Sequence, residues 1–558
     1  MPATNQMRFD RNNTSGIVKM TEIECKNILV RGVNWIGDAV MTMPALRALK
    51  LANPDASITL LVKPWVSLLF KEDPNLDGII LYEDAFRGLI GKFRLAQLIR
   101  KSDFCMAMLF QNAFDAALIT FLAGIPERIG YSRDGRRLLL TKAVTFDKPV
   151  GALHHIEYYL NLVAKTGFQA RYEIPWIYLS IEERLDARNK LKALRRPVVG
   201  INPGATYGSS KRWHPARFAE VAYRVISEMK GSAVIFGGPS ETVIAEEIER
   251  EFNKLSGHSD RDSTSITHHS LMNPALLNMA GRTELRELIS MISECDVLVT
   301  NDSGPMHIGY AVRTPVVAIF GSTSPEHTGP VGKNDIAIKK ALDCSPCFER
   351  ECRRGDLNCM EMITSYEVFE AVKERVNIKK AVFFDRDGTL CRDVGYLHRM
   401  EDFEVFPGLG SLERLKERGF LLIGVSNQSG IARGLVDVEF VKRINAVFLD
   451  TYGFDGFYYC PHHPEEHCSC RKPQPGMLLD ARADHGIDLK RSFFIGDKDI
   501  DMQLARSVGA TGILVCTGQD RVSPNADYTV KDLEEAVELV LQNESQLGRQ
   551  TAGLRRML

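Results

Sequence analysis

Short apolar runs alternate with longer helical patterns along nearly the whole chain of 558 residues. Because each run is apolar on both faces, a strand formed by it must be covered by helices on both sides. Strands of this kind, separated by helices, are typical of parallel, doubly wound sheets. The sequence therefore predicts an α/β fold. Clear examples of these runs lie at 26–30, 57–62, 197–201, 232–236, 296–300 and 315–320.

The alternating pattern restarts twice, which divides the chain into three α/β units. One restart follows the charged stretch 181–196, and the other begins with the apolar run 381–385. A chain of this length has room for three or four domains of ordinary size. A polar stretch at 256–269 is predicted to be a surface insertion. The predicted divisions are a disordered start (1–20), two units (21–185 and 186–376), a third unit (377–545) and a flexible tail (546–558).

The charge balance argues against a polyanionic partner. The chain has 70 Lys and Arg against 71 Asp and Glu, for a net charge of −1, and 44% of its residues are hydrophobic. Such a chain is globular and has no bulk attraction to nucleic acid or anionic lipid, although local patches remain possible. No apolar run reaches the roughly 18 residues that span a bilayer, and the polar start lacks a secretory signal. We therefore expect a cytoplasmic protein with no transmembrane segment and no nucleic-acid partner.

Two acids, Asp385 and Asp387, follow the apolar run that opens the third unit. Because the carboxyl ends of parallel strands face a common cleft, both side chains are expected to point into it. Hydrolysis of a phosphate ester needs a nucleophile and a proton donor for the leaving oxygen. Asp385 can attack phosphorus and form an aspartyl-phosphate. Asp387 can protonate the leaving group and later deprotonate water.

Two later segments supply groups that bind phosphate. The run 421–425 ends at Ser426, Asn427 and Gln428, which offer a hydroxyl and amides to phosphate oxygens. Lys472, which follows Arg471, supplies a positive charge.

A further strand end adds a third carboxylate. The run 492–496 ends at Asp497, which together with Asp385 and Asp387 can hold Mg²⁺. A lone pair of acids is more often a surface feature than a catalyst. Four strand ends in this order, each with suitable chemistry, favour a phosphatase site.

Cysteine and histidine cluster between two turn prolines of the third unit. Cys460-x-His462 and Cys468-x-Cys470 provide four nitrogen and sulfur ligands, as a tetrahedral structural Zn²⁺ requires. All four positions would be filled by protein, so this metal would have no open site for chemistry. The spacing alone leaves the neighbouring His463 and His467 as competing ligands, and reduced surface cysteines are the alternative interpretation.

The third unit resembles the haloacid dehalogenase (HAD) superfamily, and within it the D-glycero-D-manno-heptose 1,7-bisphosphate phosphatases. The resemblance covers the whole unit. It rests on the segments FDRDGTL, GYLHRMEDFEVFPG, VSNQSGIARG, YYCPHHP, CSCRKPQPGM and IGDKDIDMQLA.

This resemblance implies a Mg²⁺-dependent phosphatase without a large cap, in which Arg471, Lys472 and Lys498 contact the substrate. It also selects His462 as the zinc ligand. Ser426 stands where the family commonly has threonine, which keeps the hydroxyl. Histidinol-phosphate phosphatases carry similar zinc loops, so histidinol phosphate or another small phosphate ester is the alternative substrate.

In the first unit, a glycine-rich turn at 31–37 leads to Asp38 and an apolar helix. An acid at this position can take a proton from a sugar hydroxyl, because the helix start faces the cleft. A simple helix-capping role for Asp38 is the alternative.

The second unit has three strand ends with polar side chains. The amides of Ser303 and Gly304, at a predicted helix start, can hold a diphosphate that Lys211 neutralises. Asp302 can bind sugar hydroxyls, and Glu241 a ribose. His307 is either a donor-site residue or a core histidine on an amphipathic helix.

The first two units resemble glycosyltransferase family 9, the ADP-heptose:lipopolysaccharide heptosyltransferases of the two-lobed GT-B fold, over about residues 26–375. The matching segments are VRGVNWIGDAVMTMPALRALK, NPGATYGSSKRW and VTNDSGPMHIGYAVRTPVVAIFGSTSPEHTGP. The resemblance implies inverting transfer without a bound metal, with Asp38 as the base that activates the acceptor. It places five residues in the donor site: Lys211, Asp302, Ser303, Gly304 and His307. The segment around Glu241, GGPSE, matches the family only loosely.

The remaining cysteines are of two kinds. A cluster at the end of the second unit can form a small metal knot or remain as reduced thiols, and its spacing does not decide between them. It consists of Cys344, Cys347, Cys352 and Cys359. The isolated cysteines are expected to be buried packing residues, and they are Cys25, Cys105, Cys295, Cys391 and Cys516.

Together these resemblances predict a bifunctional enzyme of lipopolysaccharide inner-core heptose metabolism. One part would transfer heptose from ADP-heptose to a lipopolysaccharide core acceptor, and the other would hydrolyse heptose 1,7-bisphosphate to heptose 1-phosphate. Because that acceptor is a lipid, peripheral contact with the inner membrane face is expected. The alternatives are the same folds with another nucleotide sugar, or a phosphatase joined to a transferase-like binding module without catalysis.

Overall fold

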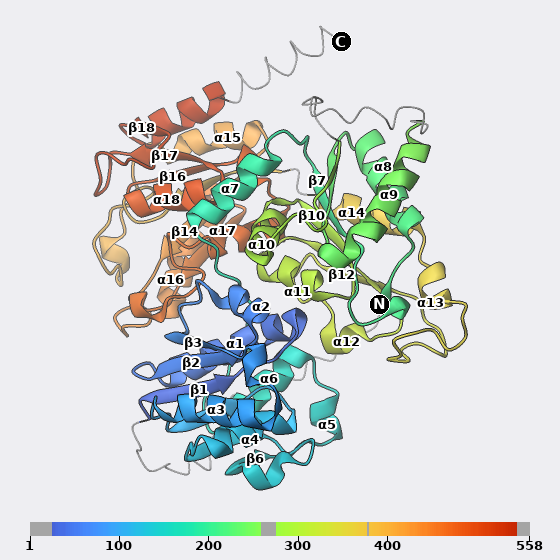
Figure 1. The fold of residues 1–558 in the computed structure, drawn as a ribbon. Helices are drawn as coiled ribbons and strands as arrows, with labels where there is room; N and C mark the ends of the chain where they lie inside the picture. Colours follow the sequence, from blue (N-terminus) through green and yellow to red (C-terminus); the bar gives the residue numbers. More distant parts are fainter. Residues whose placement is uncertain (1–24, 258–274, 377–378, 544–558) are drawn as a thin grey trace.

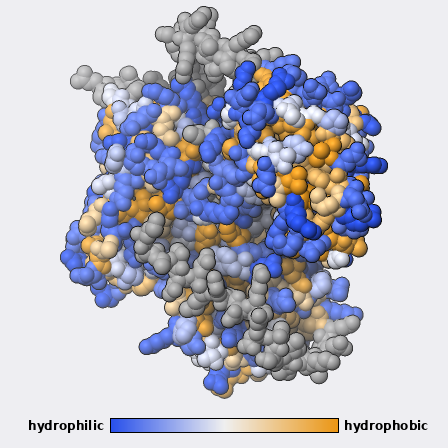
Figure 2. All heavy atoms as spheres, turned by 180° about the vertical axis from the view of Figure 1, so that it is seen from behind, coloured by the Kyte–Doolittle hydropathy of each residue, from blue (hydrophilic) through white to orange (hydrophobic). Residues whose placement is uncertain are grey.

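The computed structural model describes residues 25–257, 275–376 and 379–543. The predicted disordered start and flexible tail, and most of the predicted insertion at 256–269, lie outside these ranges. Within them, each helix is too short or too polar to cross a membrane. The back of the molecule is largely hydrophilic, and polar side chains interrupt its hydrophobic areas (Figure 2).

The first unit is a six-stranded parallel sheet in the order β3-β2-β1-β4-β5-β6, with helices on both faces (Figure 1). Its strands are β1 (Asn27–Arg31), β2 (Ser57–Val62), β3 (Gly78–Leu81), β4 (Met106–Leu109), β5 (Glu127–Tyr131) and β6 (Lys142–Val144). Its helices are α1 (Ile36–Ala52), α2 (Pro64–Ser67), α3 (Gly88–Arg100), α4 (Phe114–Leu122), α5 (Lys148–Gly151) and α6 (His155–Ala164).

The second unit repeats this design in a sheet of order β12-β11-β10-β7-β8-β9. Its strands are β7 (Val198–Asn202), β8 (Ser232–Ile235), β9 (Leu276–Asn278), β10 (Val297–Asn301), β11 (Val316–Phe320) and β12 (Ile336–Lys339). Its helices are α8 (Pro215–Ser227), α9 (Thr242–Leu255), α10 (Leu285–Glu294), α11 (Gly304–Ala311), α12 (Pro325–Thr328), α13 (Asn358–Glu361) and α14 (Ser365–Arg375).

The third unit is a parallel sheet of order β15-β14-β13-β16-β17-β18. Only short elements separate β13 from β14, as expected for a fold without a large cap. Its strands are β13 (Lys380–Asp385), β14 (Phe420–Asn427), β15 (Gly456–Cys460), β16 (Phe493–Gly496), β17 (Thr511–Val515) and β18 (Tyr528–Val530). Its helices are α15 (Glu413–Glu417), α16 (Val438–Tyr452), α17 (Gly476–His485) and α18 (Asp499–Val508).

The predicted parallel α/β class is confirmed. The run at 57–62 is a strand over that range, and the other predicted strands differ from the observed ones by one or two residues at an end. The charged stretch between the first two units contains helix α7 (Ile181–Leu191). A capping box starts this helix, in which the Ser180 and Glu183 side chains each accept from the other residue's backbone N–H.

The expectation that Cys25 and Cys105 are isolated packing residues is wrong, because the two form a disulfide with a Cα–Cα distance of 5.7 Å. The parallel register brings them together. Cys105 comes just before β4 and Cys25 just before its neighbour β1, so the amino ends of both strands lie side by side. Cys295 and Cys391 are buried as expected, whereas Cys516 is partly exposed.

The segment that joins the first two units is part of the third unit's hydrophobic core. Trp176 and Tyr178 are buried in one cluster with residues of β13–β16 and α17. The Tyr178 hydroxyl donates to the His467 carbonyl at 3.2 Å. The Arg313 guanidinium lies 4.9 Å from the centre of the Trp176 ring. The third unit therefore packs against the segment that connects the first and second units and holds it in place.

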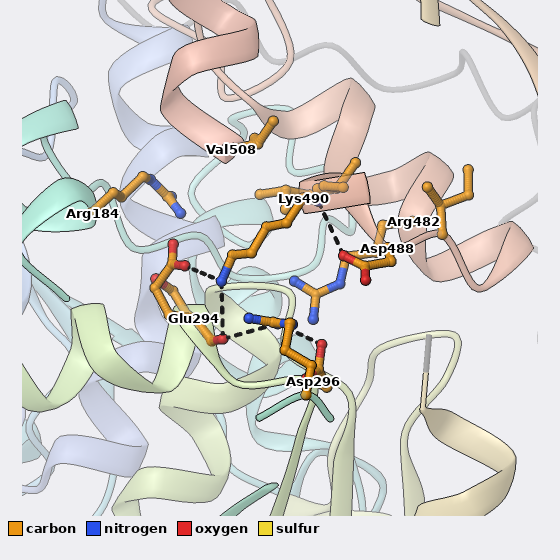
Figure 3. A pocket seen from close by; sticks show the side chains of 12 residues that line it. Arg184, Glu294, Asp296, Arg482, Asp488, Lys490 and Val508 are labelled. Carbon is orange, nitrogen blue, oxygen red and sulfur yellow. Dashed lines mark hydrogen bonds and ion pairs between the residues drawn. The ribbon is translucent and has the colours of Figure 1, made fainter. Parts of the chain in front are cut away.

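Buried ion pairs form a second junction, between α10 of the second unit and the third unit (Figure 3). Glu294 pairs with Lys490 and, at 3.3 Å, with Arg188 of α7. Although burial opposes its charge, these cations lower the pKa of Glu294 to about 2. Arg482 donates to the Cys295 carbonyl at 3.0 Å. Helix α7 crosses this junction, in contact with α10 and α18 (Figure 1).

We predict that Trp176→Ala lowers the free energy of unfolding of the third unit by about 3–5 kcal/mol, because it leaves a cavity in that core. The measurement is the denaturant concentration at which the amides of β13–β16 in the intact chain lose their protection from hydrogen exchange. Tyr172→Ala is the matched control, because Tyr172 is an exposed aromatic residue of the same connection. Equal midpoints for the two variants would show that the junction does not stabilise the third unit.

Candidate active sites and a candidate zinc centre

A buried lysine organises the carboxyl edge of the third sheet. Lys472 Nζ lies 2.6 Å from Asp385 Oδ1 at the end of β13 and 2.7 Å from Asp501 Oδ1 in the first turn of α18. All three side chains are buried. Burial disfavours the ammonium, but Asp385 and Asp501 together raise the pKa of Lys472. Lys472 is therefore charged and fixes the orientation of both carboxylates.

Three carboxylates meet beside this lysine. Oxygen atoms of Asp385, Asp497 and Asp501 lie within 4.8 Å of one another. Burial and the neighbouring Asp385 charge raise the pKa of Asp497 to about 8. The acids that the fold gathers therefore differ from the predicted Asp385, Asp387 and Asp497. The sequence interpretation missed Asp501, which lies four residues after Asp497 on the same strand-to-helix turn.

Asp387 lies next to this cluster, with its carboxylate turned toward hydrogen-bond donors. It accepts from Arg386 at 3.0 Å, from Gln428 at 2.8 Å and from the Ser426 hydroxyl at 3.2 Å. Gln428 also donates to Ser426. Ser426 and Gln428, two of the predicted phosphate-binding residues, thus lie in the site beside Asp387.

The other predicted phosphate-binding residues surround the same edge. Asn427 Oδ1 accepts from the Lys472 backbone N–H at 3.0 Å, so this side chain positions the lysine. Lys498 pairs with Asp393 at 3.1 Å. Arg471 has a buried Nη1 atom without a hydrogen-bond partner in the described part of the chain.

The residues at this edge fit a magnesium ion. Asp497 Oδ1 is buried and accepts no hydrogen bond from the described residues, while Oδ2 accepts one from the Gln519 backbone at 3.0 Å. Gly388 and Gly518 make room for this carboxylate, since a Cβ on either would lie 2.3 or 1.9 Å from Oδ2. A buried, unsatisfied carboxylate oxygen beside two more carboxylates is a ligand set for a hard divalent cation.

We predict that Asp497→Asn stabilises the metal-free protein by about 1–3 kcal/mol at neutral pH, because Asp497 must take up a proton when the chain folds, whereas asparagine need not. Between pH 3.8 and about 8 the folded parent binds more protons than the unfolded chain, so its stability falls as pH rises. The variant lacks the contribution of Asp497 to this fall in stability, and Mg²⁺ no longer raises its melting temperature. Thermal melts across pH, with EDTA or with Mg²⁺, test this. A parent melt that Mg²⁺ leaves unchanged contradicts the assignment.

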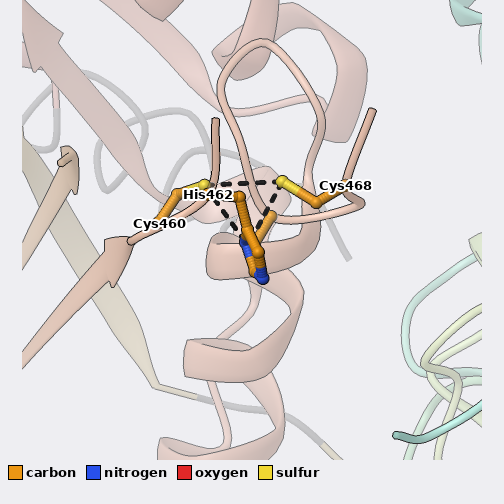
Figure 4. Close-up of side chains that lie close together, drawn as sticks. Cys460, His462 and Cys468 are labelled. Atoms are coloured by element: carbon orange, nitrogen blue, oxygen red, sulfur yellow. Dashed lines mark hydrogen bonds between the residues drawn. The ribbon is translucent and has the colours of Figure 1, made fainter. Parts of the chain in front are cut away.

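The cysteine and histidine cluster has the geometry of a tetrahedral metal site (Figure 4). The Sγ atoms of Cys460 and Cys470 each lie 3.4 Å from that of Cys468. His462 Nδ1 lies 3.5 Å from the Cys460 sulfur and 3.1 Å from the Cys470 sulfur. A tetrahedral Zn²⁺ with bonds of about 2.3 Å to sulfur separates its ligands by roughly 3.5–3.8 Å. These four residues therefore fit zinc.

The two competing histidines do not join this cluster. His463 Nδ1 accepts from the Glu465 backbone N–H instead. The loop between the ligand pairs also contacts the first unit, where Arg47 donates to the Glu466 carbonyl at 3.3 Å. A metal that orders this loop therefore also supports the junction with α1.

We predict that Cys468→Ser reduces the zinc bound per chain and lowers the unfolding midpoint of the third unit, because structural zinc sites contribute directly to folding. Metal analysis by atomic emission and denaturant unfolding of the intact chain measure the two effects. The matched control is Cys516→Ser, which removes a partly exposed cysteine outside the cluster. Zinc content equal in both variants contradicts this site.

The first sheet presents Asp38 at its carboxyl edge. Asp38 lies in the first turn of α1, and the residue at the helix cap is Trp35, whose side chain makes no capping hydrogen bond. The Asp38 side chain instead lies 3.3 Å from His155 Nδ1 at the start of α6. His155 is a member of this edge that the sequence interpretation missed.

Helix α11 of the second unit meets α1 of the first, so the two carboxyl edges face each other. A Cβ on Gly37 would lie 2.6 Å from the His307 ring, which makes glycine necessary there. His307 is buried, and its Nδ1 lies 2.8 Å from the Tyr310 hydroxyl. Burial lowers the pKa of His307 to about 4, so this ring is neutral at pH 7. Gly304 lies against Ile36 in the same contact.

The remaining predicted donor-site residues gather at the ends of β7, β8 and β10. Lys211 Nζ lies 2.5 Å from Asp302 Oδ2, which also accepts from the Thr323 hydroxyl at 2.6 Å. The Ser303 hydroxyl lies 3.3 Å from Asn202 Oδ1. Glu241 accepts from the Gly238 backbone N–H at 2.7 Å. The structure thus brings together charged groups and helix-start amides at one edge.

The cysteine cluster of the second unit is more open than the zinc-like group. Among the described residues, no three of these side chains bring their ligand atoms within 4.8 Å of one another. They are Cys344, Cys347, Cys352 and Cys359.

The three sheets define a two-lobed GT-B fold followed by a capless HAD-like fold. Residues 92–358 match glycosyltransferase family 9 (heptosyltransferase), and residues 469–536 match the HAD-hydrolase-like family. Lipopolysaccharide heptosyltransferase 2 of Salmonella typhimurium is 32% identical over 353 residues, which cover 62% of this chain and 96% of that protein. The structure of E. coli ADP-heptose LPS heptosyltransferase II aligns with a TM-score of 0.52 at 27% identity, covering 62% of this chain and 98% of that one.

The third unit has relatives of its own. The D-glycero-beta-D-manno-heptose-1,7-bisphosphate 7-phosphatase of Photorhabdus laumondii is 41% identical over 192 residues, which cover 32% of this chain and 97% of that protein. The chain therefore belongs to glycosyltransferase family 9 in its first two units and to the heptose bisphosphate phosphatases of the HAD-like hydrolases in its third.

Proposed function

We propose that this chain is a bifunctional enzyme of lipopolysaccharide inner-core heptose metabolism. Its transferase part moves heptose from ADP-heptose to a lipopolysaccharide core acceptor with inversion. Its phosphatase part hydrolyses D-glycero-D-manno-heptose 1,7-bisphosphate to heptose 1-phosphate. The observation that carries the proposal is that two separate parts of one chain each align with nearly the full length of an enzyme named for heptose chemistry.

In the phosphatase part, Asp385 is the nucleophile. Its carboxylate attacks phosphorus and forms an aspartyl-phosphate, and Lys472 holds it in place throughout. Asp387, hydrogen-bonded to Ser426 and Gln428, gives a proton to the leaving oxygen and later takes one from water. Arg471 and Lys498 bind the substrate phosphate or sugar at the same edge.

Asp385, Asp497 and Asp501 would hold Mg²⁺ in this site, together with Asp387 of the predicted set. When bound, the ion neutralises charge on the transferring phosphoryl group. Zn²⁺ on Cys460, His462, Cys468 and Cys470 would be structural. It would hold the loop that leads to Arg471 and Lys472.

In the transferase part, Asp38 removes the proton of the acceptor hydroxyl as that oxygen attacks the sugar. His155, 3.3 Å away, orients the carboxylate. On the facing carboxyl edge of the second sheet, Lys211 and the amides of Ser303 and Gly304 stabilise the departing diphosphate. Asp302, Glu241 and His307 complete the donor side, with Asp302 aligned by its bond to Lys211.

We further propose the predicted divisions as functional units. Residues 21–185 form the acceptor lobe, 186–376 the donor lobe and 377–545 the phosphatase. The protein would act in the cytoplasm and contact the inner membrane face where its acceptor is anchored.

We predict that single substitutions separate the two activities. Asp385→Asn lowers phosphate release from heptose 1,7-bisphosphate about a thousandfold or more and leaves heptosyl transfer unchanged. Asp38→Asn lowers transfer from ADP-heptose by about 10²–10⁴-fold and leaves phosphate release unchanged. Both activities are measured on the intact chain, with histidinol phosphate as the competing phosphatase substrate. Faster hydrolysis of histidinol phosphate, or transfer unaffected by Asp38→Asn, would overturn the corresponding half of the proposal.

A further inference from the structure

Large apolar side chains lie exposed around the carboxyl edge of the first sheet. They come after four neighbouring strands, because the loops that follow β1, β2, β3 and β4 all emerge at this edge. Leu89 is 76% exposed, Ile90 72% and Trp35 60%. We call this group the apolar rim: Trp35, Trp65, Leu89, Ile90, Phe93 and Phe114.

Contacts between neighbouring loops connect part of the rim. The Trp65 indole N–H donates to the Asn34 carbonyl at 3.1 Å, which joins the loops after β1 and β2. Lys63 lies over the rings of Trp65 and Tyr82, at 5.7 and 4.3 Å, which joins the loops after β2 and β3.

Helices α3 and α4 close the other end of the rim. Lys92 of α3 pairs with Asp115 of α4 at 3.6 Å, beside Phe114. These contacts place the rim residues on one surface rather than at scattered points.

Helix α3 shows that the exposure is systematic. Leu95, Ala96 and Ile99 are buried on the inner side of α3. Ile90 and Phe93 lie on the opposite side, where a helix of a soluble protein normally carries polar residues, and Leu89 is exposed in the first turn. Within the described residues, the main neighbours of α3 are α4 and the short turn 84–86, so neither of the other units covers this outer face.

The charge of α3 matches an anionic surface. The segment 87–102 contains five basic residues and no acidic one, although the chain as a whole is neutral. Arg94 and Lys101 are exposed on the same outer side as Ile90. A helix with large apolar residues beside Lys and Arg lies in the interface of a bilayer, where anionic lipids attract its cations.

We propose that the apolar rim and the outer face of α3 dock on an anionic phospholipid bilayer. Trp35 directly precedes the turn that carries Asp38, so docking through the rim brings the candidate base to the membrane surface. The orientation rests on the proposed function, since it serves an acceptor anchored in lipid. The docking surface itself follows from exposure and charge alone.

The test is co-sedimentation of the intact protein with vesicles of phosphatidylethanolamine and phosphatidylglycerol, and with vesicles of phosphatidylcholine alone. We expect the parent to bind the anionic vesicles. The Leu89→Ser/Ile90→Ser variant should bind them with an affinity lower by a factor of about ten or more. Val243→Ser is the matched control, because Val243 is 70% exposed on the second unit, and it should bind like the parent.

A second variant tests the charges. Arg94→Gln/Lys101→Gln should weaken binding to anionic vesicles and reduce its dependence on salt, without changing the weak binding to phosphatidylcholine. A parent that binds neither vesicle, or a Leu89→Ser/Ile90→Ser variant that binds like the parent, overturns the proposal. A parent dimer in sedimentation velocity that this variant dissociates would assign the rim to a second copy of the chain and would also overturn it.

Two activity measurements keep this proposal separate from the proposed function. The Leu89→Ser/Ile90→Ser variant should retain phosphate release and should transfer heptose normally to an acceptor dispersed in detergent. Loss of vesicle binding with both activities intact supports the docking surface. If the parent binds vesicles but transfers no heptose, the docking surface stands and the proposed transferase activity fails.

Discussion

The parallel direction of all three sheets is the constraint on which the rest of the molecule depends. Because the strands of each sheet run in the same direction, they all end at the same edge. Helical crossovers return the chain to the opposite edge, so the loops that follow the strands lie next to one another. Asp385, Asp497 and Lys472 reach one point in this way from separate segments. The same geometry places Asp38 opposite the start of α11. The sheet topology therefore brings together reactive side chains that are far apart in the sequence.

Gathering carboxylates has an electrostatic consequence that the fold must balance. Three buried acids within 4.8 Å repel one another, and burial adds to the penalty. Lys472 offsets part of it through two short ion pairs, while Asp497 keeps one oxygen without a donor among the described residues. The Lys472 ammonium thus stabilises the site, and the free oxygen of Asp497 is available to bind a metal cation.

The fusion is more than two enzymes on one chain. Trp176 and Tyr178, in the connection between the transferase lobes, are buried in the phosphatase core. The buried pairs of Glu294 and the contact from Arg47 to the zinc-like loop add two further attachments. Each attachment uses groups that would be exposed and solvated if the units were separate. The phosphatase unit therefore stabilises the segment that connects the two transferase lobes.

The sequence by itself determined the α/β class, the strand positions to within one or two residues, and most of the chemistry at the strand ends, because two-sided apolar runs and the polar residues after them are local features. It also marked the four residues of the zinc-like cluster, which lie within one short stretch. Only the tertiary structure decided that Asp501 joins the acid cluster, that His155 lies beside Asp38 and that Cys25 reaches Cys105. These pairings depend on strand order and on helix direction, which bring together residues whose separation in the sequence carries no sign of their contact.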